Sequence, residues 1–250
     1  MKVKVKKGDV IWNYLSIVSS LGSNIVIVPF VMYYLSGEML GLWYVFCSVG
    51  GIASLFDFGF TVTFSRNITY CWSGAKSYKK IGGVQEVSKE PDFKMMNVIL
   101  FVCRKVYMII AIVILILMLS LGSLYIYNIS SHLDYNVTLS AWVLYSIGVF
   151  LNMYYNYYDS FLRGVGAVEK ASKSRTIAKL SQIFLMAILL VCGCGIIGIS
   201  IAYILFGCLF RLLCKYAFYR HEGLKDKLLS RVSSLSFQKR TGLALFEMLI

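Results

Sequence analysis

The chain has 250 residues, of which 58% are hydrophobic and 15% are charged, and its mean hydropathy is +0.72. A soluble globular domain has roughly 25% charged residues and a disordered chain has low hydrophobicity, so the composition argues against both classes. The formal net charge of +13 leaves two classes of partner, nucleic acid and an anionic membrane surface.

Five long stretches of the chain contain no Asp, Glu, Lys or Arg, and they are 10–37, 39–56, 106–133, 135–158 and 180–210. A membrane-spanning helix needs about 20 mainly apolar residues. Four of the stretches therefore predict one span each, and the second extends past Asp57 to reach full length. The fifth stretch is long for one span and short for two.

The positions of the basic residues decide how the fifth stretch is interpreted. All 25 Lys and Arg fall in four groups, with four in 1–9, eight in 66–105, five in 163–179 and eight after residue 210. Cytoplasmic loops concentrate Lys and Arg. A hairpin that turns at the glycine-rich segment 193–198 places all four groups on one side of the membrane, so we expect two helices in this stretch.

The sequence therefore predicts an all-α, polytopic membrane protein with a six-helix bundle and both termini cytoplasmic. We expect the spans to lie at 10–35, 40–65, 101–126, 138–162, 174–193 and 197–218. Residues 1–220 form this unit, including a cytoplasmic loop at 66–100. Residues 221–250 are expected to be a cytoplasmic connector and the start of a truncated seventh helix. With every basic residue at the inner face, anionic membrane lipids become the predicted partner of the charge, and nucleic acid does not.

Polar residues at helical spacing predict the site. Three of the expected spans have one polar face each, and we expect these faces to surround a wet cavity. The faces consist of Asn13, Ser16, Ser20 and Asn24 in the first span, Gly50, Ser54, Asp57 and Thr61 in the second, and Asn152, Asn156, Asp159 and Arg163 in the fourth.

Each candidate also has a purely structural interpretation. Small and hydroxyl residues hold membrane helices together, and this is the favoured role for the Ser, Gly and Thr positions. Asp57 is a functional candidate because an ionisable residue inside a span faces the interior or a cavity. Asp159 and Arg163 form either a local i, i+4 ion pair or part of the site.

Two further features can likewise have either a structural or a functional role. Arg66, at the inner boundary, either sets the topology or holds a phosphate group. Pro29 interrupts the hydrogen bonds of the first span and is either a static kink or a hinge. The two histidines, His132 and His221, are expected on opposite sides of the membrane, so no metal site is predicted. No cofactor is expected either.

The order of several short motifs resembles a known transporter family. The first part of the chain has Asn13, Pro29, Leu35, Gly41-Leu42-Trp43, Asp57-Phe58-Gly59 and Arg66, and the later part has Asp159, Leu162-Arg163-Gly164 and the basic stretch 170–179. Over essentially the whole chain this order resembles the polysaccharide (O-antigen type) flippases of the multidrug/oligosaccharidyl-lipid/polysaccharide exporter superfamily.

The resemblance implies a transporter of the bacterial inner membrane. Such a protein moves an undecaprenyl-pyrophosphate-linked oligosaccharide to the outer leaflet for surface polysaccharide synthesis, by alternating access between two six-helix lobes around a cationic cavity. Asp57, Arg66, Asp159 and Arg163 lie where the family tends to have polar residues. Members have two lobes, so this chain corresponds to the amino-terminal one, and truncation is the favoured explanation.

Three alternatives to this function remain open. The first is a drug/cation antiporter or a lipid II flippase of the same superfamily. The second is an integral-membrane glycosyl- or acyltransferase, although no cluster of catalytic groups at one membrane face supports an enzyme. The third is a non-transporting partner of other polysaccharide-assembly membrane proteins.

Overall fold

The computed structural model describes residues 7–74, 91–224 and 228, apart from the side chains of residues 9, 23, 24 and 26. Every regular element in this part of the chain is helical, which confirms the predicted all-α class there. The elements are α1 (Lys7–Tyr34), α2 (Gly37–Leu55), α3 (Phe60–Ser73), α4 (Phe93–Leu117), the π-helical η1 (Met118–Gly122), α5 (Ser123–Ile129), α6 (Tyr135–Tyr155), α7 (Tyr157–Gly164), α8 (Val168–Val191), α9 (Gly195–Tyr219) and the 3-10 helix η2 (His221–Gly223).

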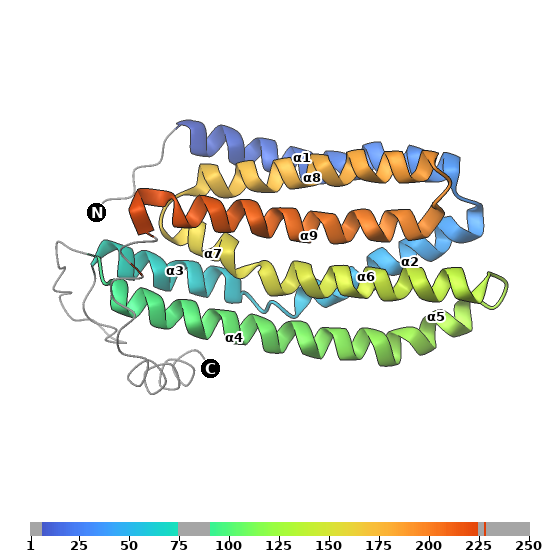
Figure 1. The fold of residues 1–250 in the computed structure, drawn as a ribbon, viewed down its shortest axis with the longest axis horizontal. Coiled ribbons are helices and arrows are strands. Elements are labelled where there is room, and N and C mark those ends of the chain that lie inside the picture. The colour runs from blue at the N-terminus through green and yellow to red at the C-terminus, as the bar shows by residue number, and fades with distance from the viewer. Residues whose placement is uncertain (1–6, 75–90, 225–227, 229–250) are drawn as a thin grey trace.

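Six helical segments of the described chain are long and apolar enough to cross a membrane, as predicted. They are Val10–Tyr34, Gly37–Leu55, Phe93–Ile129, Tyr135–Gly164, Val168–Val191 and Gly195–Tyr219. Because six is an even number, the start of α1 and the end of α9 lie at the same end of the bundle (Figure 1).

The helices lie side by side in an elongated bundle (Figure 1). In it, α9 packs between α8 and α6, α6 also packs on α4, and α1 lies along α8. The first helix therefore contacts α8, far along the sequence, much more extensively than it contacts its neighbour α2. This arrangement brings α2, α6, α8 and α9 together around the middle of the bundle.

The second predicted span, at 40–65, is wrong as a single helix. The structure ends α2 at Leu55 and begins α3 at Phe60, with Phe58 and Gly59 at positive φ of 44° and 77°. Glycine adopts this backbone region without steric cost, whereas it is strained for Phe58. A carboxylate oxygen of Asp57 accepts from the Thr61 N–H at 3.4 Å in the first turn of α3. The helix is therefore broken beside Asp57, the acidic residue of the predicted second span.

The third and fourth spans also differ from their predicted bounds. The third begins at Phe93 rather than 101, and its α-helical hydrogen bonding gives way to the π-helical η1. Trp142 donates from its indole N–H to the Met118 carbonyl at 3.3 Å and to the Ser123 hydroxyl at 3.1 Å there. The fourth span is interrupted at Asn156, between α6 and α7.

The predicted hairpin between the fifth and sixth spans is confirmed. The turn from α8 to α9 occupies residues 192–194, with Gly193 and Gly195 at positive φ of 78° and 50°. The glycines that interrupt the apolar run allow this tight reversal.

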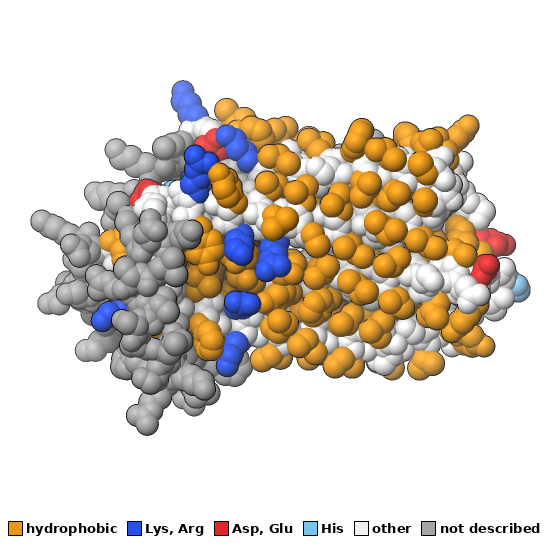
Figure 2. Space-filling view, viewed as in Figure 1, with side chains coloured by type: hydrophobic (Ala, Val, Ile, Leu, Met, Phe, Trp, Pro, Cys, Tyr) orange, Lys and Arg blue, Asp and Glu red, His pale blue; other side chains and the backbone are white. Residues whose placement is uncertain are grey.

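The surface of the bundle has an apolar middle region and a basic end. Large apolar side chains cover the middle, and Lys and Arg gather toward the end where α1 begins and α9 ends (Figure 2). Many of the apolar side chains are exposed, which suits contact with lipid tails. The expected loop 66–100 is shorter than predicted, because residues 66–73 belong to α3 and residues 93–100 belong to α4. Residues 75–90 between these helices, and all but a few residues of the expected connector 221–250, lie outside the described residues.

Candidate functional site

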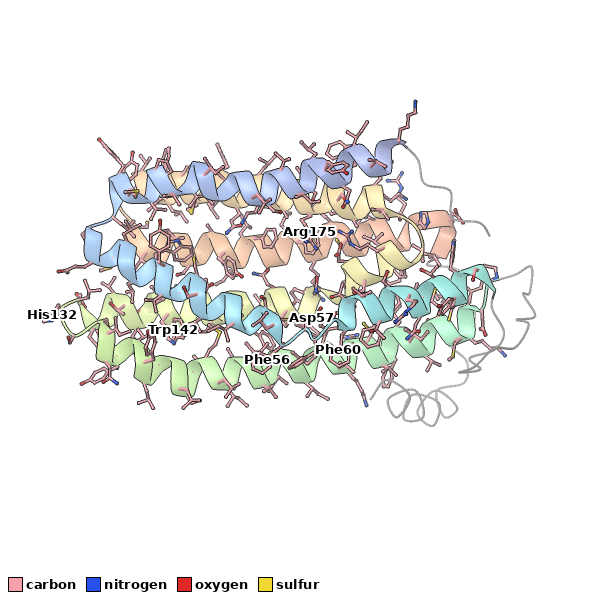
Figure 3. The ribbon with its side chains drawn as sticks, turned by 180° about the vertical axis from the view of Figure 1, so that it is seen from behind. Phe56, Asp57, Phe60, His132, Trp142 and Arg175 are labelled. Carbon is pink, nitrogen blue, oxygen red and sulfur yellow. The ribbon has the colours of Figure 1, made fainter. Side chains whose placement is uncertain are left out.

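A cleft of about 290 Å3 lies between α2, α6, α8 and α9. It is polar on one side and aromatic on the other, and its walls are made by Gly50, Ser54, Asp57, Val149, Asn152, Met153, Asn156, Arg175, Tyr203, Phe206 and Phe210. Two of the lining residues carry charge, the acid Asp57 and the base Arg175. Figure 3 shows Asp57 at the break between α2 and α3, with Arg175 on the α8 side of the same region.

The break after α2 turns Asp57 toward α4 and α6. One carboxylate oxygen accepts a hydrogen bond from the Tyr107 hydroxyl at 2.7 Å. The Thr61 hydroxyl lies 2.8 Å from the same tyrosine oxygen and accepts from the Asn156 side-chain amide at 3.0 Å. This chain of polar contacts joins three helical segments across the interior, and it fixes the position of the acid at the edge of the cleft.

Asn152 lies one turn before Asn156 and also faces the cleft. Its side-chain amide lies next to Tyr203, and both its nitrogen and its oxygen are buried. Neither atom is within normal hydrogen-bond distance and angle of a partner among the described residues. The backbone of α9 approaches closely here because Gly207 has no side chain, and a Cβ at that position would overlap the Asn152 oxygen. A buried amide in this state can both donate to a ligand and accept from one.

Arg175 enters the cleft from α8. Its Nη2 donates to Oδ2 of Asp159 at 2.9 Å, and Nε of Arg163 donates to the same oxygen at 3.0 Å. The Asp159 side chain is only 3% exposed, so this is a buried ion pair between α7 and α8. The Arg175 guanidinium lies 5.3 Å from the centre of the Phe210 ring, and its buried Nε has no partner within the described chain.

The structure brings together three of the predicted site residues. Asp57, Asn152 and Asn156 line the cleft, and the polar faces expected on the second and fourth spans do meet. Asp159 and Arg163 lie outside it, and the Asp159 carboxylate is linked to it by the ion pair with Arg175. Arg66 is an exposed residue of α3 and does not line the cleft.

The described side chains of the first span do not complete the cavity as expected. None of them lines the cleft, because α1 packs along the outer side of α8. Ser16 on its polar face is buried there, as expected of a residue that holds helices together. The chain continues as a helix through Pro29, which is exposed. Asn24 belongs to the same helix, but its side chain is outside the described part.

The sequence interpretation missed Arg175 and Tyr107. Arg175 belongs to the basic group 163–179 and to the start of the predicted span 174–193, and neither marks it as a site residue. Four polar or charged residues nevertheless share one face of the helix at spacings of three, four and three, namely Ser172, Arg175, Lys179 and Gln182. That polar stripe indicates that this helix face turns toward the site. No sequence signal identifies Tyr107, because a lone tyrosine among apolar residues is an ordinary core residue.

The cleft has the chemistry of a binding site. It presents amide, hydroxyl and guanidinium donors together with carboxylate and amide acceptors, inside a bundle of apolar helices. The phenylalanine and tyrosine rings on the α9 side give it an apolar wall. Comparison with protein-family models, with curated proteins and with solved structures finds no match to this chain.

Proposed function

We propose that this chain is one lobe of a transporter that moves a lipid-linked, undecaprenyl-pyrophosphate oligosaccharide across the bacterial inner membrane for surface polysaccharide synthesis. In this proposal the cleft between α2, α6, α8 and α9 forms part of the substrate path. The observation that carries it is a cleft with a carboxylate, a guanidinium and buried amides among six apolar helices. Polar and ionisable groups in such positions mark substrate pathways in membrane proteins.

The residues of the cleft suit the two polar parts of such a substrate. Sugar hydroxyls both donate and accept hydrogen bonds, and the side-chain amides of Asn152 and Asn156 do the same. Arg175 uses one nitrogen for Asp159 and keeps other donors, including the unpartnered Nε, for a phosphate group. The aromatic wall on α9 supplies a face for the apolar side of a sugar ring.

The charge on the outside of the bundle supports an orientation. We place the end that gathers Lys and Arg at the cytoplasmic face, because cytoplasmic segments concentrate these residues. Both the start of α1 and the end of α9 are then cytoplasmic, and the turns near His132 and Gly193 face outward.

One observation favours a second function, a drug/cation antiporter. Among the described residues Asp57 forms no ion pair, so its carboxylate in the cleft has no fixed positive partner. A carboxylate in an apolar surrounding is costly unless a proton or a cation accompanies it. An organic cation could fulfil that role.

Equilibrium binding separates the two functions. The full chain is purified into nanodiscs and titrated with a fluorescent undecaprenyl-pyrophosphate disaccharide and, separately, with tetraphenylphosphonium. We expect saturable binding of the disaccharide lipid that weakens in Arg175→Gln and Asn152→Leu. Asn136→Leu is the matched control, because Asn136 lies on the same helix α6 but is exposed and outside the cleft.

The two binding titrations distinguish the flippase from the antiporter. Binding of tetraphenylphosphonium that depends on Asp57, without binding of the disaccharide lipid, favours the antiporter. Disaccharide-lipid binding that is absent, or that falls equally in the Asn136→Leu control, contradicts the proposed function.

A further inference from the structure

Helices α4 and α9 carry basic residues without any acid, and α6, which packs on both, has no charged residue. Apart from Lys94 in its first turn, α4 carries Arg104 and Lys105, and α9 carries Arg211 and Lys215. None of these four forms an ion pair within the described residues. Cations at the edge of an apolar bundle need an anion or water, so the missing partner must come from outside this part of the chain.

The two arginines are held in place by a pair of tyrosines at the end of α6. Arg104 donates from Nε to the Tyr154 hydroxyl at 3.1 Å. Arg211 donates from Nη1 to the Tyr155 hydroxyl at 2.7 Å and lies 4.1 Å from the centre of that ring. The two tyrosine rings are 4.9 Å apart, and both arginines are therefore positioned around one aromatic pair.

Each guanidinium keeps donors that the protein does not use. Within the described chain, one nitrogen of Arg104 has a hydrogen bond, to Tyr154, and Nε of Arg211 is buried without a partner. A guanidinium has five N–H donors in a planar fork, which matches two oxygens of a phosphate group. Lysine offers only a mobile point charge, so the two neighbouring lysines differ from this pair in kind.

The surroundings place this pair at the membrane boundary. On the face formed by α9, α6 and α4, a row of Lys and Arg separates the apolar surface from the end of the bundle (Figure 2). On the apolar side α4 exposes Ile109, Val113 and Ile116. A ligand here meets guanidinium groups at one end and an apolar helix surface at the other.

We propose that Arg104 and Arg211, oriented by Tyr154 and Tyr155, bind the phosphate of an anionic membrane phospholipid, whose acyl chains lie along α4 and α9. The site is on the outer surface of the bundle and separate from the cleft, so it does not depend on the proposed transport function.

Native mass spectrometry of the full chain in detergent tests the site. The protein is titrated with phosphatidylglycerol, with phosphatidylcholine and with inorganic phosphate. We expect phosphatidylglycerol to bind more tightly than phosphatidylcholine. Arg104→Gln and Arg211→Gln should each weaken the phosphatidylglycerol complex at least about fivefold, since a basic residue near an anionic lipid surface contributes about that factor.

Two further variants separate a built site from a general positive surface. Lys105→Gln removes the same charge from the same turn of α4, where Lys105 is exposed and lies over the Phe101 ring. It should reduce binding less than Arg104→Gln does. Tyr155→Phe keeps all charges and the ring but removes the hydroxyl that orients Arg211, and it should also weaken binding. Arg211→Lys preserves the charge that sets topology and should still bind more weakly than the unaltered protein.

Three results would overturn the proposal. The first is equal affinity for phosphatidylglycerol and phosphatidylcholine. The second is an equal loss in Lys105→Gln and Arg104→Gln, which indicates an unspecific surface field. The third is binding of inorganic phosphate as tightly as of phosphatidylglycerol, which indicates an anion site without a lipid. Binding of the disaccharide lipid in the cleft is measured separately, so failure of one proposal is distinguishable from failure of the other.

Discussion

The Tyr107 hydroxyl donates a 2.7 Å hydrogen bond to Asp57 and so joins α4 to the break between α2 and α3. Tyr107 is fully buried, and Phe fits the same space. We expect Tyr107→Phe to lower the free energy of unfolding by about 0.6 kcal/mol, the average measured for hydrogen bonds between membrane helices, and by no more than the measured maximum of about 1.7 kcal/mol. Unfolding in a detergent titration measures the change.

Tyr127→Phe is the control for that substitution. Tyr127 is 63% exposed, and its loss of a hydroxyl should change the unfolding free energy very little. Equal effects of the two substitutions would show that the contact between Tyr107 and Asp57 contributes nothing.

The buried ion pair of Asp159 predicts a larger effect. Asp159→Asn leaves Arg163 and Arg175 without their acid, and breaking a buried pair costs about 3–5 kcal/mol. Because the two arginine side chains are 30% and 35% exposed, we expect the lower end of that range. The comparison is Glu169→Gln, which breaks the more exposed pair with Lys173 and should cost less than about 1 kcal/mol. A smaller loss for Asp159→Asn than for Glu169→Gln would contradict the assignment.

Two adjacent glycines of α2 provide a matched test of how the cleft is built. A Cβ at Gly50 would overlap the hydroxyl of Tyr145, whereas a Cβ at Gly51 meets nothing within 4 Å. Tyr145 is fixed by stacking on Tyr203 at 5.0 Å, so it has little room to move. We expect Gly50→Ala to destabilise the protein by about 1–3 kcal/mol and Gly51→Ala to leave it unchanged or slightly more stable. The thermal unfolding midpoints of the two variants give the answer, and equal midpoints would argue against this packing.

The chain's own cysteines report its orientation. Cys192 and Cys194 are exposed at the turn between α8 and α9, at the end opposite to the basic residues. If the basic end is cytoplasmic, a membrane-impermeant maleimide added to spheroplasts should label the protein, and Cys192→Ser combined with Cys194→Ser should abolish that labelling. Labelling that appears only after the membrane is permeabilised would reverse the proposed orientation.

The sequence was sufficient to predict six helical segments long enough to span a membrane, because four uncharged runs mark one span each and the positions of the basic residues divide the fifth run into two. The breaks in the spans were harder to predict. Asp57-Phe58-Gly59 contains a glycine suited to a turn, but apolar residues continue on both sides of it. Whether the helix breaks there depends on the hydrogen bonds of Tyr107 and Asn156, which come from other helices. Asn156 was placed on the correct face, yet nothing in its neighbourhood indicated that α6 ends beside it.

The site was predictable only where its residues share a helix face. The spacing of Asn152 and Asn156 placed both correctly, and Asp57 was identified because an acid inside a span is costly. The partners of these residues could not be found in this way, since which helices meet depends on packing. The polar face of the first span favoured α1 as the third wall, but α8 and α9 form that wall, and the described side chains of α1 do not line the cleft.

Photo-cross-linking tests most directly whether the cleft receives the lipid-linked substrate. Phe206→p-benzoylphenylalanine places the reactive group in the cleft wall, and Phe184→p-benzoylphenylalanine places it on α8 at a side chain that is 71% exposed. With an undecaprenyl-pyrophosphate disaccharide in nanodiscs, we expect irradiation to attach the lipid at position 206 much more than at position 184. Equal attachment at both positions, or none at position 206, would contradict a substrate path through the cleft.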